Sequence, residues 1–399
     1  MRFSRSSLAV AAVGLLLAAG CSNNGPGAQG TGGGSGGGDI KLLVLSQLQA
    51  ASFSFPEIAD GAQAAAASVN AAGGVNGHKI IVDVCNDQGD PNVAATCGRK
   101  AVQEGYSAVL NGVSLYAASY MPLLEAASVP AVGGSPLTPP DFTSPMSFPT
   151  NGGNPLDYGG AGYFSGKTGC KSTVLIRDTA AAVEETTKAM TTGAQLSGAP
   201  VQAVIKQAGT STDFSAPVSQ AVATNADCML LAEQPAAVAK IVGSVRQSSK
   251  PTMPIYTNVA GFPAVLAKSL GPAANGVRVN SSQPLPTPQA TPTFLADMQK
   301  YSPNAPVSTQ SLLGWAGVQV IKQVGAKADG TDHTAILKAL QSSTAVTIEG
   351  YPQTFNFSQP RTGQYPRIFA TSNYGWEYRD GDYQPEFDGK PVDVSAVLG

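Results

Sequence analysis

The sequence has little that would support metal chemistry or contact with nucleic acid. It contains only two histidines, His78 and His333, far apart in the chain, and no Cys-x-x-Cys pair. Protein zinc sites need His and Cys ligands at short, regular spacings, so we expect no metal and no cofactor. Lys and Arg total 24 against 26 Asp and Glu, which gives a formal net charge of −2. Without a basic excess we expect no nucleic-acid partner.

A run long enough to span a membrane is also missing. The most apolar segment, Leu8–Leu17, has ten residues, whereas a spanning helix needs about 20. Arg2 and Arg5 precede it, and the small residues Ala18, Ala19 and Gly20 follow it. This order is typical of a secretory signal peptide, which we assign to residues 1–20. Its removal takes away two Arg and no acid, so 22 basic and 26 acidic residues remain, a net charge of −4.

Cys21 follows these small residues directly. The arrangement resembles the bacterial lipobox, in which the thiol carries diacylglycerol; the Leu that a lipobox prefers three residues before the Cys is Ala18 here. Residues 22–38 are mostly Gly and predict a flexible tether. We therefore expect residues 21–38 to anchor an extracytoplasmic lipoprotein to the outer face of the cell membrane. The alternative is an ordinary secreted protein with an incidental Cys at the cleavage site.

From residue 41 onward, short apolar runs alternate with segments of helical periodicity. Such alternation predicts α/β architecture, with parallel sheets covered by helices on both faces. The expected strands are 41–48, 78–84, 108–113, 129–132, 173–177, 201–206, 229–232, 254–257 and 277–280. The expected helices are 57–72, 92–104, 116–127, 180–197, 214–225, 235–249, 261–270, 310–328 and 332–342. In the tail, the aromatic segments 351–357, 365–371 and 374–379 look strand-like.

Two Pro- and Gly-rich stretches, 133–155 and 281–292, interrupt the alternation and look like connections between lobes. They divide the chain into two doubly wound, Rossmann-like halves. We expect an N-terminal lobe of residues 39–155 plus 283–345 and a C-terminal lobe of residues 156–282 plus 346–399.

Four cysteines remain after Cys21, an even number in an oxidising compartment, where disulfides persist. In a doubly wound sheet the first strand lies between the second and the third. Cys170 and Cys228 precede two such neighbouring strands, and Cys85 and Cys97 flank one strand–helix loop. We therefore prefer the pairs Cys85–Cys97 and Cys170–Cys228 over the two other pairings. Four buried free thiols are the alternative.

Residues 61–91, GAQAAAASVNAAGGVNGHKIIVDVCNDQGDP, carry a resemblance to a known family. A helix ending in Asn-Ala-Ala-Gly-Gly-Val-Asn-Gly, followed by a strand and the turn of Asp87, Asp90 and Pro91, resembles the type I periplasmic binding proteins of the leucine/isoleucine/valine-binding group. Weaker matches continue in order over most of residues 41–380. The resemblance implies two lobes joined by three crossovers, a solute held in the cleft as the lobes close, and an ABC permease as partner.

The resemblance also implies where the solute is bound. In the family, strand-end loops of the first lobe hold a ligand carboxylate with backbone NH groups and hydroxyls. The matching residues here are Ser114, Leu115, Tyr116, Gly134, Ser135 and Thr138. Helix N-termini favour anions, although Ser114 can equally be only the cap of its helix.

The second lobe departs from the family pattern. The expected aromatic–Gly pair is absent after Asp178, where Thr179 follows, and no carboxylate follows the strand that ends near Asn258. Glu233 either replaces that missing acid as the anchor of a ligand ammonium or is a solvated cap. Because a buried ammonium without a carboxylate is costly, we doubt that a branched-chain amino acid is the ligand. Phe53 and Phe55 are expected to cover the cleft mouth.

These observations favour a monomeric solute-binding component of an ABC importer for an amino-acid-like, amide or carboxylate solute. A sensory module that reports the same kind of ligand to a membrane receptor is the alternative. A surface enzyme is disfavoured, because neither His lies near a candidate nucleophile. The segment Ala161–Thr168 is similar to a phosphate-binding loop, but it has Ala where the motif needs Gly.

Overall fold

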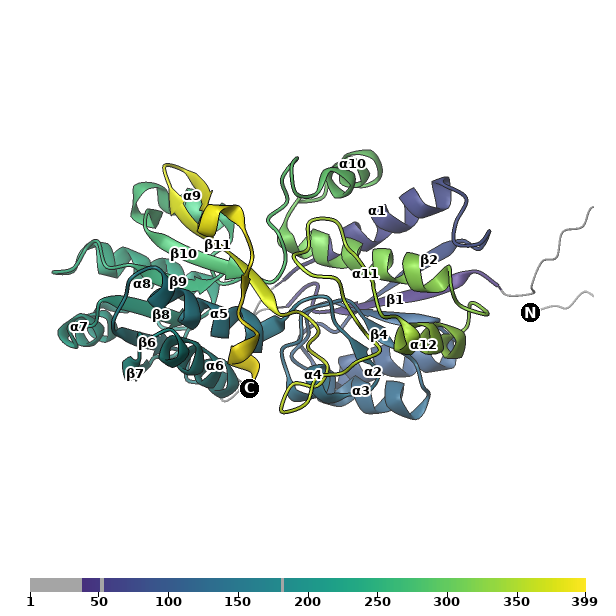
Figure 1. Ribbon diagram of the computed structural model, residues 1–399, viewed down its shortest axis with the longest axis horizontal. Helices are drawn as coiled ribbons and strands as arrows, with labels where there is room; N and C mark the ends of the chain where they lie inside the picture. The colour runs from purple at the N-terminus through teal and green to yellow at the C-terminus, as the bar shows by residue number, and fades with distance from the viewer. Residues whose placement is uncertain (1–37, 51–53, 181–182) are drawn as a thin grey trace, which may run out of the picture. The chain divides into compact units, whose positions relative to one another are not determined.

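The computed structural model describes residues 38–50, 54–180 and 183–399. The predicted signal peptide, Cys21, residues 22–37 of the Gly-rich segment and Phe53 lie outside these residues. The described chain holds two mainly parallel sheets with helices on both faces, as Figure 1 shows. The predicted fold class, two doubly wound lobes joined by three connections, is confirmed.

The first sheet has five parallel strands in the order β2-β1-β3-β4-β5. Its strands are β1 (Ile40–Ser46), β2 (Ile80–Asn86), β3 (Ala108–Asn111), β4 (Ala131–Val132) and β5 (Ser147–Phe148). The helices of this lobe are α1 (Glu57–Ala71), α2 (Pro91–Gln103), α3 (Ala117–Ala126), α4 (Pro139–Thr143), α10 (Pro292–Tyr301), α11 (Thr309–Gly325) and α12 (His333–Ser342). Strand β1 lies inside the sheet, between β2 and β3, and nearly all of its residues are buried.

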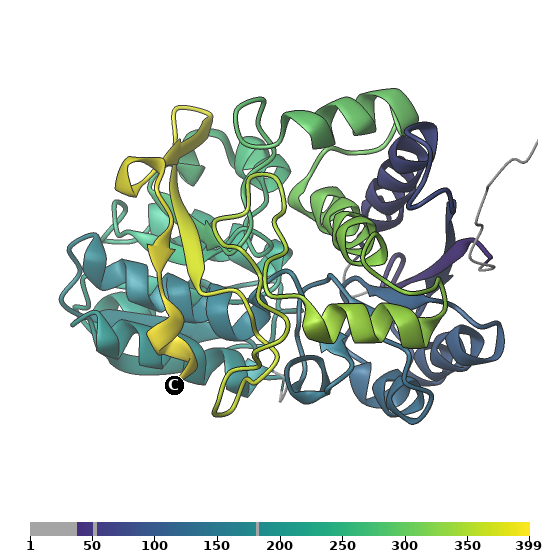
Figure 2. The same cartoon turned by 45° about the vertical axis from the view of Figure 1, so that its right-hand side comes forward.

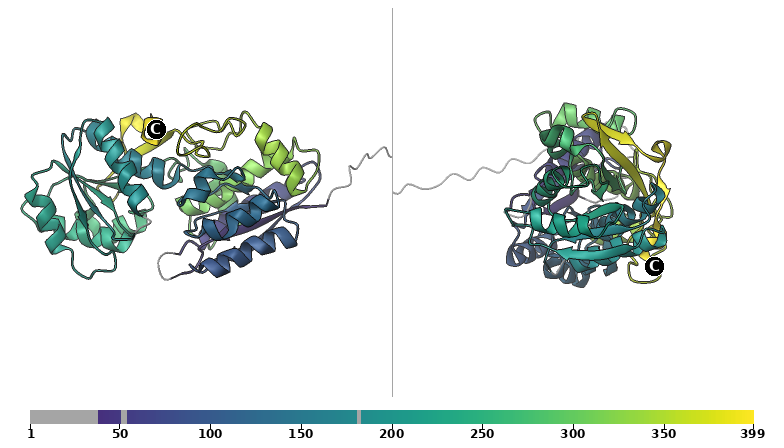
Figure 3. Two further views of the ribbon diagram at one scale, coloured as in Figure 1. Left: turned by 90° about the horizontal axis from the view of Figure 1, so that it is seen from below. Right: turned by 90° about the vertical axis from the view of Figure 1, so that its left-hand side faces the viewer.

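The second sheet has the order β12-β11-β10-β9-β8-β6-β7, and β13 pairs with β11. Its parallel strands are β6 (Thr173–Arg177), β7 (Val201–Lys206), β8 (Cys228–Ala232), β9 (Ile255–Asn258) and β10 (Val277–Ser281). The antiparallel strands are β11 (Ser372–Arg379), β12 (Asp382–Pro385) and β13 (Val392–Asp393). Its helices are α5 (Gly153–Lys167), α6 (Val183–Leu196), α7 (Ser215–Ala223), α8 (Pro235–Arg246) and α9 (Ala264–Leu270). Figure 3 shows them on both faces of the sheet.

Both preferred disulfides are present. Cys85–Cys97 joins β2 to α2, and Cys170–Cys228 joins neighbouring strands, because β6 lies between β7 and β8. Their Cα separations, 5.7 and 6.1 Å, lie within the usual range for a disulfide.

Helix α11 packs directly on α1. A Cβ at Gly61 would lie 1.9 Å from the carbonyl oxygen of Ser311, and one at Gly314 would lie 1.9 Å from that of Ile58. Only glycine permits this distance between the two backbones. Through this contact, α11, which follows the second connection, packs on the first lobe.

The stretch 133–155, predicted as a connection, also contains α4, β5 and the start of α5, and a helix, α10, begins at the end of the 281–292 stretch. Two strand predictions in the tail were wrong: segments 351–357 and 365–371 form no strand beyond one isolated bridge between Val346 and Phe355. Both contain a Pro, which cannot donate to a sheet ladder.

The tail segment instead fills the first hydrophobic core with aromatic rings. Nine buried side chains between residues 346 and 370 belong to the same cluster as those of β1. Phe357 packs edge-on against Phe148 of β5, and the Arg367 guanidinium lies over the rings of Phe148 and Phe369. In Figure 2 this yellow-green segment runs from α12 toward β11. The exact division of the chain between the lobes stays a prediction.

Candidate functional site

A cavity of about 60 Å³ lies where the carboxyl ends of strands from both sheets meet the connecting segments. That volume is several times what one water molecule needs. In open α/β sheets, ligands bind beyond the carboxyl ends of the strands. The lining residues are Phe55, Val113, Ser135, Leu137, Asn151, Gly153, Asn154, Asp157, Asn258, Val259, Ala260, Ser281, Gln283, Thr309, Gln310 and Leu313.

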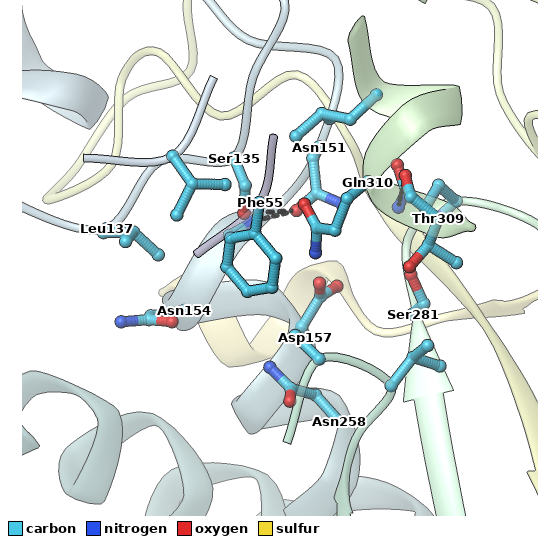
Figure 4. Close-up of a pocket in the computed structure, with 16 residues that line it drawn as sticks. Phe55, Ser135, Leu137, Asn151, Asn154, Asp157, Asn258, Ser281, Thr309 and Gln310 are labelled. Atoms are coloured by element: carbon cyan, nitrogen blue, oxygen red, sulfur yellow. Dashed lines mark hydrogen bonds between the residues drawn. The ribbon is translucent and has the colours of Figure 1, made fainter. Parts of the chain in front are cut away.

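Hydrogen bonds hold the polar lining in place. The Ser135 hydroxyl donates to Asn151 Oδ1 at 3.1 Å, a contact that Figure 4 shows. Gln283 links two segments, because its Nε2 donates to the Thr309 carbonyl at 2.9 Å and its Oε1 accepts from the Tyr351 hydroxyl at 3.1 Å. Gln310 Oε1 is buried and finds no partner among the described residues. The lining is therefore partly fixed in advance and partly open to a ligand.

Asp157 is the one ionisable side chain among the described residues that line the cavity. It lies on α5, is 6% exposed, and accepts a hydrogen bond from the Ser282 backbone NH at 2.9 Å. Burial raises the pKa of Asp157 to about 7, and hydrogen bonds from Ser282 and Asn151 oppose that rise. The carboxyl group is therefore close to half ionised at neutral pH.

The residues expected on the first lobe are only partly at the cavity. Ser135 lines it, and Gly134 lies beside Ser135 with a φ of +80°. Leu115 and Tyr116 are half-buried and do not line it.

The two remaining hydroxyls on this side are bound to carboxylates. Ser114 is buried, and its hydroxyl donates to Asp87 Oδ2 at 2.5 Å. Thr138 caps α4, with its hydroxyl 2.9 Å from Asp141 Oδ2. Neither side chain lines the cavity, so their role as ligand contacts stays a prediction.

On the second lobe, Asn258 lines the cavity, whereas Asp178, Thr179 and Glu233 do not. Asp178 accepts hydrogen bonds from the backbone NH groups of Ala180 and Gly209 at 2.7 and 2.9 Å, and Thr179 is exposed. The structure thus brings Ser135 and Asn258 together at one cavity and leaves the other predicted residues around it.

Glu233 is not a solvated cap, since its side chain is only 4% exposed. Neither carboxylate oxygen has a hydrogen-bond partner among the described residues. Burial raises the pKa of Glu233 to about 8, and the nearby charge of Asp178 adds to the rise. Glu233 is therefore mostly protonated at neutral pH in this conformation.

Sequence reasoning missed Asn151, Asp157, Gln283 and Gln310. Asn151 follows β5, Asp157 and Gln283 lie in the connecting segments, and Gln310 lies in the first turn of α11. No single lobe's pattern places them together. One signal was available: Asp157 is the only acid in the Gly-rich segment that forms α5.

The model of a family described as "periplasmic binding protein" matches residues 40–368. The chain belongs to the periplasmic binding protein family. Curated proteins include no match to it.

Solved structures share the fold of this periplasmic binding protein at low sequence identity. One is LivJ, a branched-chain amino acid transporter substrate-binding protein from Streptococcus pneumoniae solved with isoleucine (18% identity, TM-score 0.73, covering 89% of this chain and 99% of that one). A fatty acid ABC transporter substrate-binding protein from Thermomonospora curvata has 16% identity and a TM-score of 0.74, covering 90% and 94%. A leucine-binding protein, LivK, from Thermotoga maritima has 16% identity and a TM-score of 0.70, covering 89% and 99%. At these identities the likeness supports the two-lobed fold.

Within the residues that the structure describes, no helix is both long and apolar enough to span a bilayer. The same residues hold no group of three or more His, Cys, Asp or Glu side chains that could bind one metal ion.

Proposed function

We propose that this chain is the solute-binding component of an ABC importer, which captures a small organic solute between its lobes and delivers it to a membrane permease. The observation that carries the proposal is the cavity at the carboxyl ends of strands from both sheets, with polar side chains contributed by both and by the connecting segments. Family membership and the function of the relatives named above support it.

The solute need not be a branched-chain amino acid. The relatives with related folds include one named for fatty acids as well as those named for leucine or isoleucine. The cavity lining combines the apolar side chains of Phe55, Leu137 and Leu313 with several amides. Such a lining suits a solute with an apolar frame and one polar end.

We further propose that the protein acts outside the cytoplasm as a monomer, tethered by lipid on Cys21. The secretory pattern of residues 1–20 and the position of Cys21 directly after it support this location. The two disulfides agree with an oxidising compartment.

The proposal is tested by native mass spectrometry of the full chain, solubilised in detergent, to find a co-purified solute. Thermal unfolding in a broad library of small solutes then measures binding, since a ligand that binds only the folded state raises the melting temperature. We expect one chemical class to stabilise the protein and to reduce hydrogen exchange in both lobes. The absence of a co-purified solute together with the absence of any stabilising solute would refute a binding function.

A further inference from the structure

On the first lobe, the hydroxyls that the resemblance assigns to a ligand carboxylate are already in use. The hydroxyl of Ser114 donates to Asp87, and that of Thr138 donates to Asp141. Both acids are buried, with exposed fractions of 0% and 2%. A ligand carboxylate would therefore compete with two carboxyl groups of the protein for the same donors.

Backbone NH groups of the same lobe are bound as well. The NH of Ser135 donates to the Gly112 carbonyl at 3.0 Å. The NH groups of Leu137 and Thr138 donate to Asp141 Oδ2 at 3.2 and 2.9 Å. The protein's own oxygens thus occupy the donors that an anion would need on this side of the cavity.

The cavity lining supplies no positive side chain for an anion. Among the described residues that line it, none is Lys, Arg or His, and Asp157 is the one acid. The N-terminal end of α11 reaches the cavity, where Thr309 and Gln310 line it. The hydroxyl of Ser308 caps this helix, because it accepts from the NH groups of Gln310 and Ser311 at 3.1 and 3.2 Å. These NH groups are therefore not available to an anion.

A positive solute is disfavoured too. Asp157 accepts hydrogen bonds from the backbone and side chain of Ser282 and from Asn151, so its carboxyl group is satisfied without a cation. The positive end of the α11 dipole lies at the cavity and opposes a positive charge there. Glu233 does not line the cavity. A charged or zwitterionic solute would therefore bury a charge without a matching partner, which is costly.

The lining does offer neutral donors and acceptors. Figure 4 shows the amides of Asn151, Asn258 and Gln310 around the cavity, together with the hydroxyls of Ser135 and Ser281. Gln310 Oε1 is buried and accepts no hydrogen bond from the described residues. A buried acceptor without a donor costs free energy, and an N–H or O–H group of the solute would remove that cost.

We propose that the solute is uncharged at neutral pH and that its polar end, a carboxamide or a hydroxyl group, donates a hydrogen bond to Gln310 Oε1. This inference rests on the proposed function and narrows the class of its solute, because it excludes carboxylates and amino acids. Gln310 is then a specificity-determining residue. The apolar side chains of Phe55, Val113 and Leu137 contact the rest of the solute.

The test attaches different polar ends to one apolar frame and measures binding by isothermal titration of the full chain in detergent. The isobutyl frame gives isovaleramide, isopentanol, isovalerate, isopentylamine and L-leucine. The benzyl frame gives phenylacetamide, phenethyl alcohol, phenylacetate, phenethylamine and L-phenylalanine. Native mass spectrometry of the same preparation identifies any co-purified solute, whose structure gives its charge at neutral pH.

The variant Gln310→Met removes the acceptor and keeps a side chain of similar length that favours a helix, so we expect it to fold. Gln319→Met makes the same change on the same helix. Gln319 is half-buried and does not line the cavity, so this variant is the matched control.

We expect the amide or the alcohol of at least one frame to bind the wild type. The acid, the amine and the amino acid of that frame should bind at least about 100-fold more weakly, because each buries an unpaired charge. Gln310→Met should weaken binding of the neutral probe about tenfold, and Gln319→Met should leave it unchanged. A co-purified solute that is uncharged supports the proposal equally.

Three results would overturn the inference while the solute-binding function stands. In the first, the acid, the amine or the amino acid binds as tightly as the neutral probes. In the second, the co-purified solute is charged. In the third, Gln310→Met binds the neutral probe as tightly as the wild type does. If no probe binds and no solute co-purifies, the solute-binding function itself fails and this inference fails with it.

Discussion

The polar groups on the two sides of the cavity differ in their hydrogen-bond partners. On the first lobe, the hydroxyls of Ser114 and Thr138 are bound to the carboxylates of Asp87 and Asp141. On the side of α5 and the second lobe, Asp157 accepts hydrogen bonds from Ser282 and Asn151, whereas both oxygens of Glu233 have no partner among the described residues. The two first-lobe hydroxyls are therefore satisfied without a ligand, whereas the carboxyl group of Glu233 is not.

This contrast has an energetic meaning. A satisfied hydrogen bond at a buried site stabilises the fold, whereas a buried carboxyl group without partners costs stability once it ionises. We therefore expect substitutions on the first side to destabilise the protein and neutralisation of Glu233 on the second side to stabilise it. The three predictions below test this from the largest effect to the smallest.

The largest effect is expected at Gly134, where the first side is most tightly packed. A Cβ at this position would lie 1.5 Å from the carbonyl oxygen of Asn111, and the φ of +80° disfavours any L side chain. Gly134→Ala should lower the free energy of unfolding by at least about 4 kcal/mol or prevent folding. Urea unfolding followed by circular dichroism measures this.

The control for this prediction is Gly105→Ala. Gly105 has a φ of +66°, but its Cβ would meet nothing within 4 Å. Its cost should be only about 1 kcal/mol. Equal losses for the two variants would show that backbone conformation, and not packing against Asn111, governs this loop.

The second effect is a gain in stability on the other side. The pKa of Glu233 is about 8 in the folded chain, above its ordinary value of 4.5. Between these values the unfolded chain releases a proton that the folded chain retains, so stability falls as pH rises from about 4.5 to 8. Glu233→Gln removes this penalty and should raise the free energy of unfolding by up to about 3.5 kcal/mol more at pH 8 than at pH 5.

Urea titrations at both pH values measure this difference. The exposed Glu125→Gln on α3 is the control and should leave stability unchanged at both. A loss of stability in Glu233→Gln at pH 8 would mean that the carboxylate has a favourable partner in the folded protein.

The smallest effect compares two hydroxyls of the first lobe. Ser114 donates to a carboxylate at 2.5 Å in a buried site, whereas Ser135 donates to an amide oxygen at 3.1 Å at the cavity. Ser114→Ala should cost about 2 kcal/mol and Ser135→Ala about 1 kcal/mol, because charge-assisted hydrogen bonds are the stronger ones. Chemical unfolding measures both. If Ser135→Ala lowers the free energy of unfolding more than Ser114→Ala does, the Ser135–Asn151 hydrogen bond stabilises the fold more than its length suggests.

Much of the fold follows from local pattern. Buried apolar runs such as 41–48 and 173–177 predicted the interior strands β1 and β6, and the expected flanking of β6 by β7 and β8 led to the pair Cys170–Cys228. The tail was misread because its aromatic residues resemble a strand pattern. Those rings pack in the first core without forming a ladder, a choice that depends on residues about 200 positions earlier in the chain, such as Phe148.

The candidate site was less accessible to prediction. Ser135 and Asn258 follow strands, so the rule that ligands lie beyond the carboxyl ends of strands found them. Asp157, Asn151 and Gln310 lie in or beside connecting segments, and only the packing of α5 and α11 brings them to the same cavity.

By itself, the sequence determined the alternation of strands and helices and indicated the parallel sheets, because hydrophobic periodicity is a local property of the chain. The preferred cysteine pairing followed from the strand order of a doubly wound sheet. It also supplied the secretory pattern and Cys21. Tertiary structure alone decided which polar groups share the cavity and in which charge state. The physical reason is that burial sets the pKa of a carboxyl group, and the burial of Asp157 and Glu233 depends on segments distant in the chain.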